Sequence, residues 1–101
     1  MRKSTSRSKK SSRDLGYEVR LHAEVSRYLV KLAVGAPKDA GRCAGALREL
    51  AKDPFTPRPG VDIAPWRGPE FDYRLRVGRH RFGYRTDKRA KIAIVDAAWF
   101  K

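Results

Sequence analysis

The chain has 101 residues, of which 24 are Lys or Arg and 11 are Asp or Glu, so its formal net charge is +13. This length allows one small domain with a modest core, and no stretch is apolar enough to span a membrane. The basic excess is typical of proteins that bind polyanions such as nucleic acids, and it argues against an ordinary small-molecule enzyme.

The first fourteen residues form a basic, serine-rich arm. Six Lys and Arg residues precede the first acidic residue, Asp14, and no apolar residue follows Met1 in this arm. Such a segment cannot bury enough surface to offset the entropy lost on ordering. We therefore predict that residues 1–14 are disordered and add non-specific affinity for polyanions, and that residues 15–101 form the folded domain.

The folded part opens with the period of a strand and then changes to the period of a helix. Residues 17–21 alternate between apolar and polar side chains, which predicts a short strand. Residues 25–32 have the apolar spacing of a helix, and Gly35 is a suitable end for it. Pro37 suits the first turn of a second helix, whose buried stripe includes Cys43. These two helices are expected to form a hairpin.

A proline-rich segment follows the helices. Five of the six prolines lie between Asp53 and Pro69, which argues against a helix or a central strand and predicts an extended surface loop. Trp66 lies in this loop. It either stacks on an RNA base or closes over the edge of the core.

Residues 73–85, YRLRVGRHRFGYR, predict one β-hairpin with an apolar face and an arginine face. With Gly78 as the first residue of a type II′ turn, Arg76 lies directly opposite Arg81. Opposed arginines cost stability unless an anion offsets them, and guanidinium groups suit phosphate oxygens.

A polar turn over 86–89 and an apolar strand over 91–97 are the last predicted elements. The predicted fold class is α+β, with two helices on one face of an antiparallel sheet and the other face open.

The cysteine count and the histidines argue against a metal site. Cys43 is the only cysteine, so the chain forms no internal disulfide and no cysteine-based zinc site. His22 has no other ligand residues at metal-binding spacing and is expected at the surface. We therefore expect no cofactor, and the reducing cytoplasm is the expected compartment.

Three motifs in this order resemble the RelE/ParE superfamily of type II toxin–antitoxin systems: LRELAKDPF after the helices, WRG in the proline-rich segment and DYRLRVGRHRFGY in the hairpin. The resemblance covers residues 17–97 and is closer to the RelE side. It implies a β-α-α-β-β-β fold and a toxin that cleaves mRNA on the ribosome without a metal. It also implies an acidic RelB-like antitoxin as partner. ParE-type proteins share the fold but inhibit DNA gyrase, and a non-catalytic RNA-binding module is a third alternative.

The resemblance places the phosphate site on Arg74, Arg76 and Arg81. Cleavage by a 2′-hydroxyl also needs a proton acceptor, which arginine cannot provide at neutral pH. A tyrosine after the last strand contributes in RelE-type enzymes, and here that segment reads Trp99, Phe100, Lys101. The alternatives for this role are His80, Tyr84 and Lys101, although strand parity places His80 and Tyr84 on the core face. Further RNA contacts are expected from Arg67, Arg79, Arg85, Lys88, Lys91 and Trp99.

Overall fold

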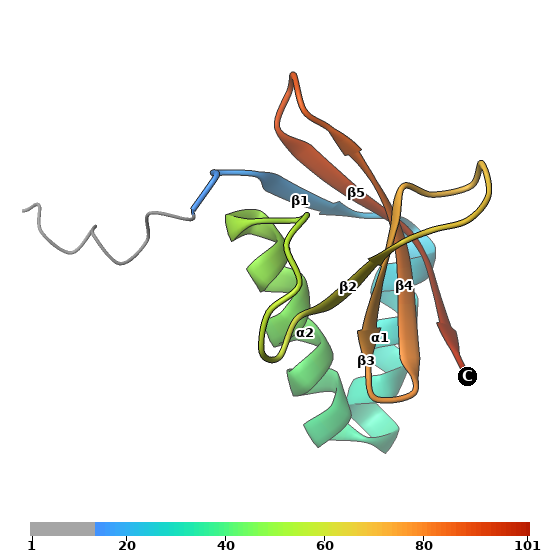
Figure 1. Ribbon diagram of the computed structural model, residues 1–101. Helices are drawn as coiled ribbons and strands as arrows, with labels where there is room; N and C mark the ends of the chain where they lie inside the picture. The colour runs from blue at the N-terminus through green and yellow to red at the C-terminus, as the bar shows by residue number, and fades with distance from the viewer. Residues whose placement is uncertain (1–13) are drawn as a thin grey trace, which may run out of the picture.

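The computed structural model describes residues 14–101, so the predicted arm up to residue 13 lies outside the described residues. Within this range two helices and five strands form one layered unit (Figure 1). In chain order the elements are β1 (Glu18–Leu21), α1 (Ala23–Gly35), α2 (Pro37–Lys52), β2 (Asp62–Pro65), β3 (Tyr73–Val77), β4 (His80–Asp87) and β5 (Ile92–Phe100).

The strands form a single sheet in the order β1-β5-β4-β3-β2, with the helical hairpin packed on one face. This confirms the predicted α+β fold class, with both helices on one face of the sheet. The sheet is mixed rather than purely antiparallel, because β1 pairs parallel with β5 while the other pairs are antiparallel. A parallel pair needs a long connection, and nearly the whole domain lies between these two strands.

The proline-rich segment is not a continuous loop, and that prediction is wrong for residues 62–65. These residues form β2, an edge strand paired with β3. Pro65 is the last residue of β2. An edge strand tolerates proline because one side of its backbone has no strand partner. The prolines therefore led the sequence analysis to overlook an edge strand, although they correctly argued against a central strand.

The hairpin of β3 and β4 has the predicted register. Arg76 pairs with Arg81 and Leu75 pairs with Phe82, and Gly78 has a positive φ of 61° at the turn. A bulge in the β4–β5 ladder shifts the register after Gly83, and β5 continues beyond its predicted end to Phe100. The extended β5 brings a tryptophan, described below, beside the arginines.

The helices and the apolar face of the sheet enclose the core. Tyr84 is fully buried, and its hydroxyl donates a 2.6 Å hydrogen bond to the carbonyl of Pro54. Cys43 is also fully buried, as predicted. His22 is exposed and caps α1, because its Nδ1 accepts from the backbone N–H of Glu24. Other fully buried residues include Val25, Leu50, Pro54, Leu75, Phe82, Ala93 and Val95. No helix within residues 14–101 is long and apolar enough to cross a membrane.

Candidate nucleic-acid interface

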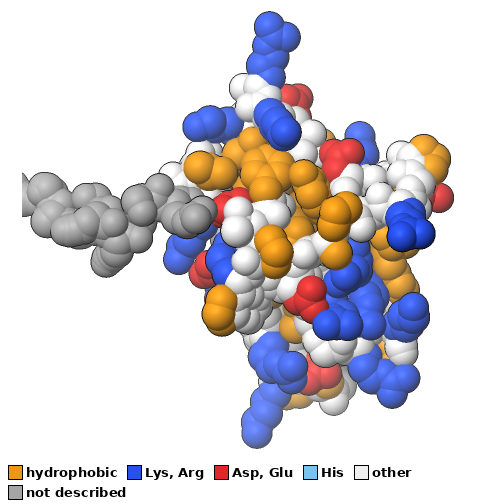
Figure 2. All heavy atoms as spheres, viewed as in Figure 1, with side chains coloured by type: hydrophobic (Ala, Val, Ile, Leu, Met, Phe, Trp, Pro, Cys, Tyr) orange, Lys and Arg blue, Asp and Glu red, His pale blue; other side chains and the backbone are white. Residues whose placement is uncertain are grey.

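Three arginines and one aspartate lie together on the sheet face that points away from the helices. Asp62 of β2 pairs with Arg76 of β3, which in turn pairs with Arg81 of β4, so the three side chains form a row across neighbouring strands. Arg74 is two residues before Arg76 on the same face. We call these four residues the arginine site. Figure 2 shows the Lys and Arg side chains that gather over this part of the sheet, with an acidic side chain beside them.

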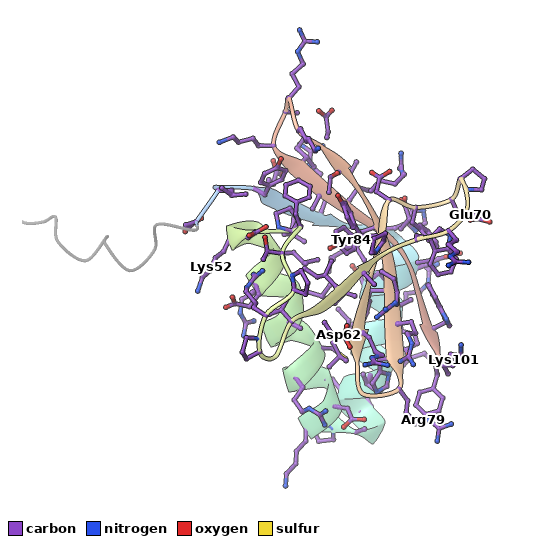
Figure 3. All side chains as sticks on the ribbon, in the orientation of Figure 1. Lys52, Asp62, Glu70, Arg79, Tyr84 and Lys101 are labelled. Carbon is purple, nitrogen blue, oxygen red and sulfur yellow. The ribbon has the colours of Figure 1, made fainter. Side chains whose placement is uncertain are left out.

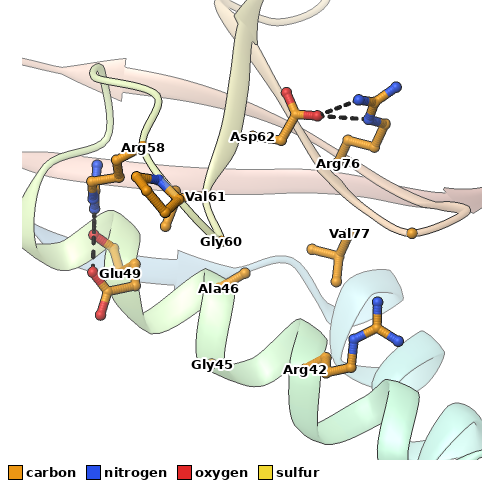
Figure 4. Close-up of a pocket in the computed structure, with 12 residues that line it drawn as sticks. Arg42, Gly45, Ala46, Glu49, Arg58, Gly60, Val61, Asp62, Arg76 and Val77 are labelled. Carbon is orange, nitrogen blue, oxygen red and sulfur yellow. Dashed lines mark hydrogen bonds and ion pairs between the residues drawn. The ribbon is translucent and has the colours of Figure 1, made fainter.

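Asp62 offsets the charge of two of the arginines. Its Oδ2 accepts from Arg76 Nε at 2.7 Å and lies 2.6 Å from Arg76 Nη2 (Figure 4). Its Oδ1 lies 3.6 Å from Arg74 Nη1, an ion pair that is too long for a hydrogen bond. The anion that the opposed arginines require is therefore supplied, at least in part, by the chain itself.

Sequence reasoning missed Asp62 because it was expected in a loop. The signal was present as a short alternation in which Asp62 and Ala64 flank the apolar Ile63, as in a half-buried strand. Ile63 is buried and Asp62 is partly exposed, which matches that alternation.

Arg81 differs from the other two arginines in its partners. Its Nη1 donates to the carbonyl of Gly78 at 2.9 Å, but within residues 14–101 it forms no ion pair with a carboxylate. Desolvation and the neighbouring charges of Arg76 and Arg74 lower the pKa of Arg81 from its ordinary value. Only two of the three guanidinium groups thus pair with the carboxylate of Asp62, and the arrangement favours an additional anion beside Arg81.

A pocket of about 780 Å³ lies between α2 and the edge formed by β2 and β3 (Figure 4). Asp62 and Arg76 line it, together with Arg42 and Arg58. Arg58 is already engaged, because its Nη2 donates to the carbonyl of Glu49 at 2.7 Å and its Nη1 donates to nearby carbonyls. Its role is to satisfy the carbonyls at the end of α2, so we do not assign this pocket to phosphate.

Three aromatic rings lie on the same face as the arginine site. Trp99 pairs with Arg81 in the β4–β5 ladder, and its ring lies 5.7 Å from that of Trp66 and 6.1 Å from that of Phe71. Phe71 covers Gly83, where an added Cβ would lie within 2.7 Å of the ring. Trp66 is also held by a 2.7 Å hydrogen bond from its Nε1 to Glu70. The ring of Trp66 therefore packs on the open face of the sheet.

Two of the expected RNA contacts, one at the hairpin turn and one on β4, are engaged with other groups of the chain. Arg79, at the hairpin turn, donates from Nε and Nη2 to the carbonyl oxygen of Lys101 at 3.1 and 2.8 Å (Figure 3). Its guanidinium lies 5.1 Å from the ring of Phe100. Arg85 donates to Asp96 at 2.6 Å. Both arginines retain exposed surface but neither belongs to the arginine site.

The remaining expected contacts are dispersed. Lys88 follows the far end of β4 and lies 5.3 Å from the ring of Phe55, and Lys91 donates to the carbonyl of Leu15 at 3.1 Å. Arg67 is exposed in the segment between β2 and β3. Asp87 lies six positions after Arg81 along β4, a distance of roughly 20 Å in an extended strand, so Lys88 and Lys91 contact a different part of any bound strand.

Two of the three residues considered as proton acceptors, His80 and Tyr84, do not line the arginine site. His80 is buried on the helix side, with Tyr28 Oη 2.7 Å from Nδ1 and Asp39 Oδ2 3.0 Å from Nε2. Tyr84 is buried in the core, and desolvation raises its pKa far above the ordinary value. The backbone N–H of Lys101 donates to the carbonyl of Arg79 near the hairpin turn. Within the described residues no three His, Cys, Asp or Glu side chains gather in a group able to hold a metal ion.

The sequence matches no protein-family model and has no significant match to a curated protein. The structure, in contrast, has the fold of RelE-like toxins. It is similar to the archaeal RelE–RelB complex from Pyrococcus horikoshii OT3, with a TM-score of 0.70, 24% identity, and 85% of this chain and 96% of that chain covered. It is also similar to the toxin–antitoxin complex RelBE2 from Mycobacterium tuberculosis, with a TM-score of 0.67, 21% identity, and 86% and 100% covered.

Proposed function

We propose that this protein is the toxin of a type II toxin–antitoxin system and that it cleaves mRNA on the ribosome through the arginine site. The observation that carries the proposal is Arg81, which has no carboxylate partner within residues 14–101 and lies beside Arg74 and Arg76 on an open sheet. A phosphorane formed during cleavage carries extra negative charge, and a fixed guanidinium stabilises that charge. The RelE-like fold supports the same activity.

The same surface suits an acidic antitoxin. Both similar structures are toxin–antitoxin complexes, and the formal charge of +13 would attract a negatively charged partner. We propose a RelB-like protein whose carboxylates meet the arginine site when the toxin is held inactive. Antitoxin and mRNA then compete for one face of the sheet.

The deciding experiment is primer extension on mRNA from translating extracts that contain the wild-type protein, Arg81→Ala or Arg89→Ala. Arg81→Ala should reduce cleavage by about 100-fold to 1000-fold, the usual cost of one lost donor to a transition-state anion. Arg74→Ala and Arg76→Ala should give smaller losses. Arg89→Ala is the matched control, because it removes the same charge from the exposed β4–β5 turn.

Two outcomes would contradict the proposal. If the wild-type protein arrests growth without producing new 5′ ends in the ribosomal A site, it is not an mRNA interferase. A supercoiling assay with purified gyrase then distinguishes a gyrase inhibitor from a protein that only binds RNA. If Arg81→Ala and Arg89→Ala cleave equally well, the protein cleaves mRNA but the arginine site is not where it does so.

A further inference from the structure

We propose that Asp62 is the proton acceptor of the arginine site and takes the proton of the attacking ribose 2′-hydroxyl. The inference rests on the proposed function, since it assumes that the protein cleaves RNA. It assigns the one role that the arginines cannot perform. His80 and Tyr84, which have the chemistry for that role, are buried on the opposite face of the sheet.

The two oxygens of Asp62 have different surroundings. Oδ2 lies 2.7 Å from Arg76 Nε and 2.6 Å from Arg76 Nη2, and this fixes the direction of the carboxylate. Within residues 14–101 no N–H or O–H group donates a hydrogen bond to Oδ1, although Arg74 Nη1 lies 3.6 Å from it. The side chain is 41% exposed, so a hydroxyl group can reach it. One oxygen is thus oriented and the other is free to accept a proton, the usual arrangement of an oriented base.

Arg74 supports this assignment. Its side chain is only 22% exposed, and its buried Nη1 has no hydrogen-bond partner among the described residues. A guanidinium in that position keeps a positive charge close to Oδ1 without using the lone pairs of that oxygen. Arg74 and Arg76 therefore act as positioning residues for Asp62, and Arg81 remains the principal phosphate ligand.

The step balances without a metal or another cofactor. Asp62 Oδ1 takes the proton from the 2′-hydroxyl, the 2′ oxygen forms a bond to phosphorus, and the bond from phosphorus to the 5′ oxygen breaks. The departing 5′ oxygen takes a proton from water, and the resulting hydroxide takes the proton from Asp62. The products are a 2′,3′-cyclic phosphate and a 5′-hydroxyl. A phosphodiester bound at Arg81 places negative charge beside Asp62, which favours the neutral carboxyl and assists the transfer.

The test compares Asp62→Asn with Asp96→Asn in the full chain. Both changes remove one negative charge, and both remove a carboxylate that lies 2.6 Å from an arginine nitrogen, Arg76 in one case and Arg85 in the other. The substrate is a ribosome programmed with a fluorescent mRNA, and cleavage is measured under single-turnover conditions together with binding. Thermal melting shows whether each variant is folded.

Asp62→Asn should lower the single-turnover rate by at least about 100-fold, the contribution expected of a general base. Its affinity for the programmed ribosome should equal or exceed that of the wild type, because a repulsive charge has been removed. Asp62→Glu should recover part of the rate, since it restores a carboxylate. Asp96→Asn should stay within a few-fold of the wild type.

The outcomes separate this inference from the proposed function. If the wild type cleaves and folded Asp62→Asn cleaves as fast, Asp62 is not the proton acceptor, although the protein remains an interferase. A faster Asp62→Asn variant would show that Asp62 only competes with the phosphate. Equal losses in rate and affinity, with no recovery in Asp62→Glu, would make Asp62 a binding residue and also overturn the assignment. If the wild type does not cleave at all, the proposed function itself has failed.

Discussion

Gly83 offers the sharpest test of how the open face of the sheet is built. It is buried, and an added Cβ would lie 2.5 Å from Cδ2 and 2.7 Å from Cγ of Phe71. Ordinary carbon contacts lie near 3.5–4.0 Å, so the ring must move by about 1 Å in a Gly83→Ala variant. Phe71 cannot move without disturbing its contacts with Trp66 and Trp99.

The expected loss of stability follows from these contacts. Overpacking of this kind costs about 1–3 kcal/mol, and a disturbed aromatic pair adds about 0.5–1.5 kcal/mol. Alanine has an entropic advantage over glycine in a strand of up to about 1 kcal/mol. We therefore expect Gly83→Ala to lower the free energy of unfolding by roughly 1–3 kcal/mol.

Urea unfolding followed by tryptophan fluorescence is a suitable assay. The chain has two tryptophans, and both contact Phe71, so their emission reports directly on the packing of these three aromatic rings. The matched background is Phe71→Ala, in which the ring that causes the clash is absent. There, Gly83→Ala should cost almost nothing. An equal loss of stability in both backgrounds would refute the reasoning, because the cost would not come from the ring.

Two further predictions concern the junction of α2 with the sheet. Tyr84→Phe should lower the free energy of unfolding by about 1–3 kcal/mol in denaturant titrations, because the buried carbonyl of Pro54 loses its 2.6 Å partner; an unchanged midpoint would mean that water replaces the hydroxyl. Burial alone would raise the pKa of Asp53, but hydrogen bonds from Thr56 and Phe55 and the charge of Arg58 lower it below its usual value. A lowered pKa in the folded state adds stability above the unfolded value near 4, and this is lost as the pH falls further. Asp53→Asn should therefore flatten the stability profile below about pH 4, and a profile like that of the wild type would contradict this account.

The hairpin could be predicted from the sequence because its determinants are local. Residues 73–77 and 80–84 alternate with period two, and Gly78 between them fixes the turn, so Arg76 had to face Arg81. Both helices were also predictable, from apolar spacing and from the proline at the start of α2. In each case a short window of sequence carried all the information.

The features that were missed depend on contacts between distant segments. Asp62 reaches Arg76 only because β2 adds to the edge of β3, and the prolines around β2 concealed that strand. The parallel pairing of β1 with β5 leaves no local mark in either strand. The contact between Trp99 and Phe71 forms only because Phe71 folds back over Gly83, and the composition of the segment does not predict this.

The place of β5 in the sheet also affects how the protein forms during synthesis. This strand is the last in the chain, yet it lies between β1 and β4, so residues 18–21 have no strand partner until residues 92–95 have been made. Such distant pairing is slow to form and leaves edges exposed in incomplete chains. A nascent chain that stops before β5 can form the hairpin of β3 and β4, but it cannot form the complete sheet. Premature release from the ribosome should therefore yield an unstable fragment rather than a partly active protein.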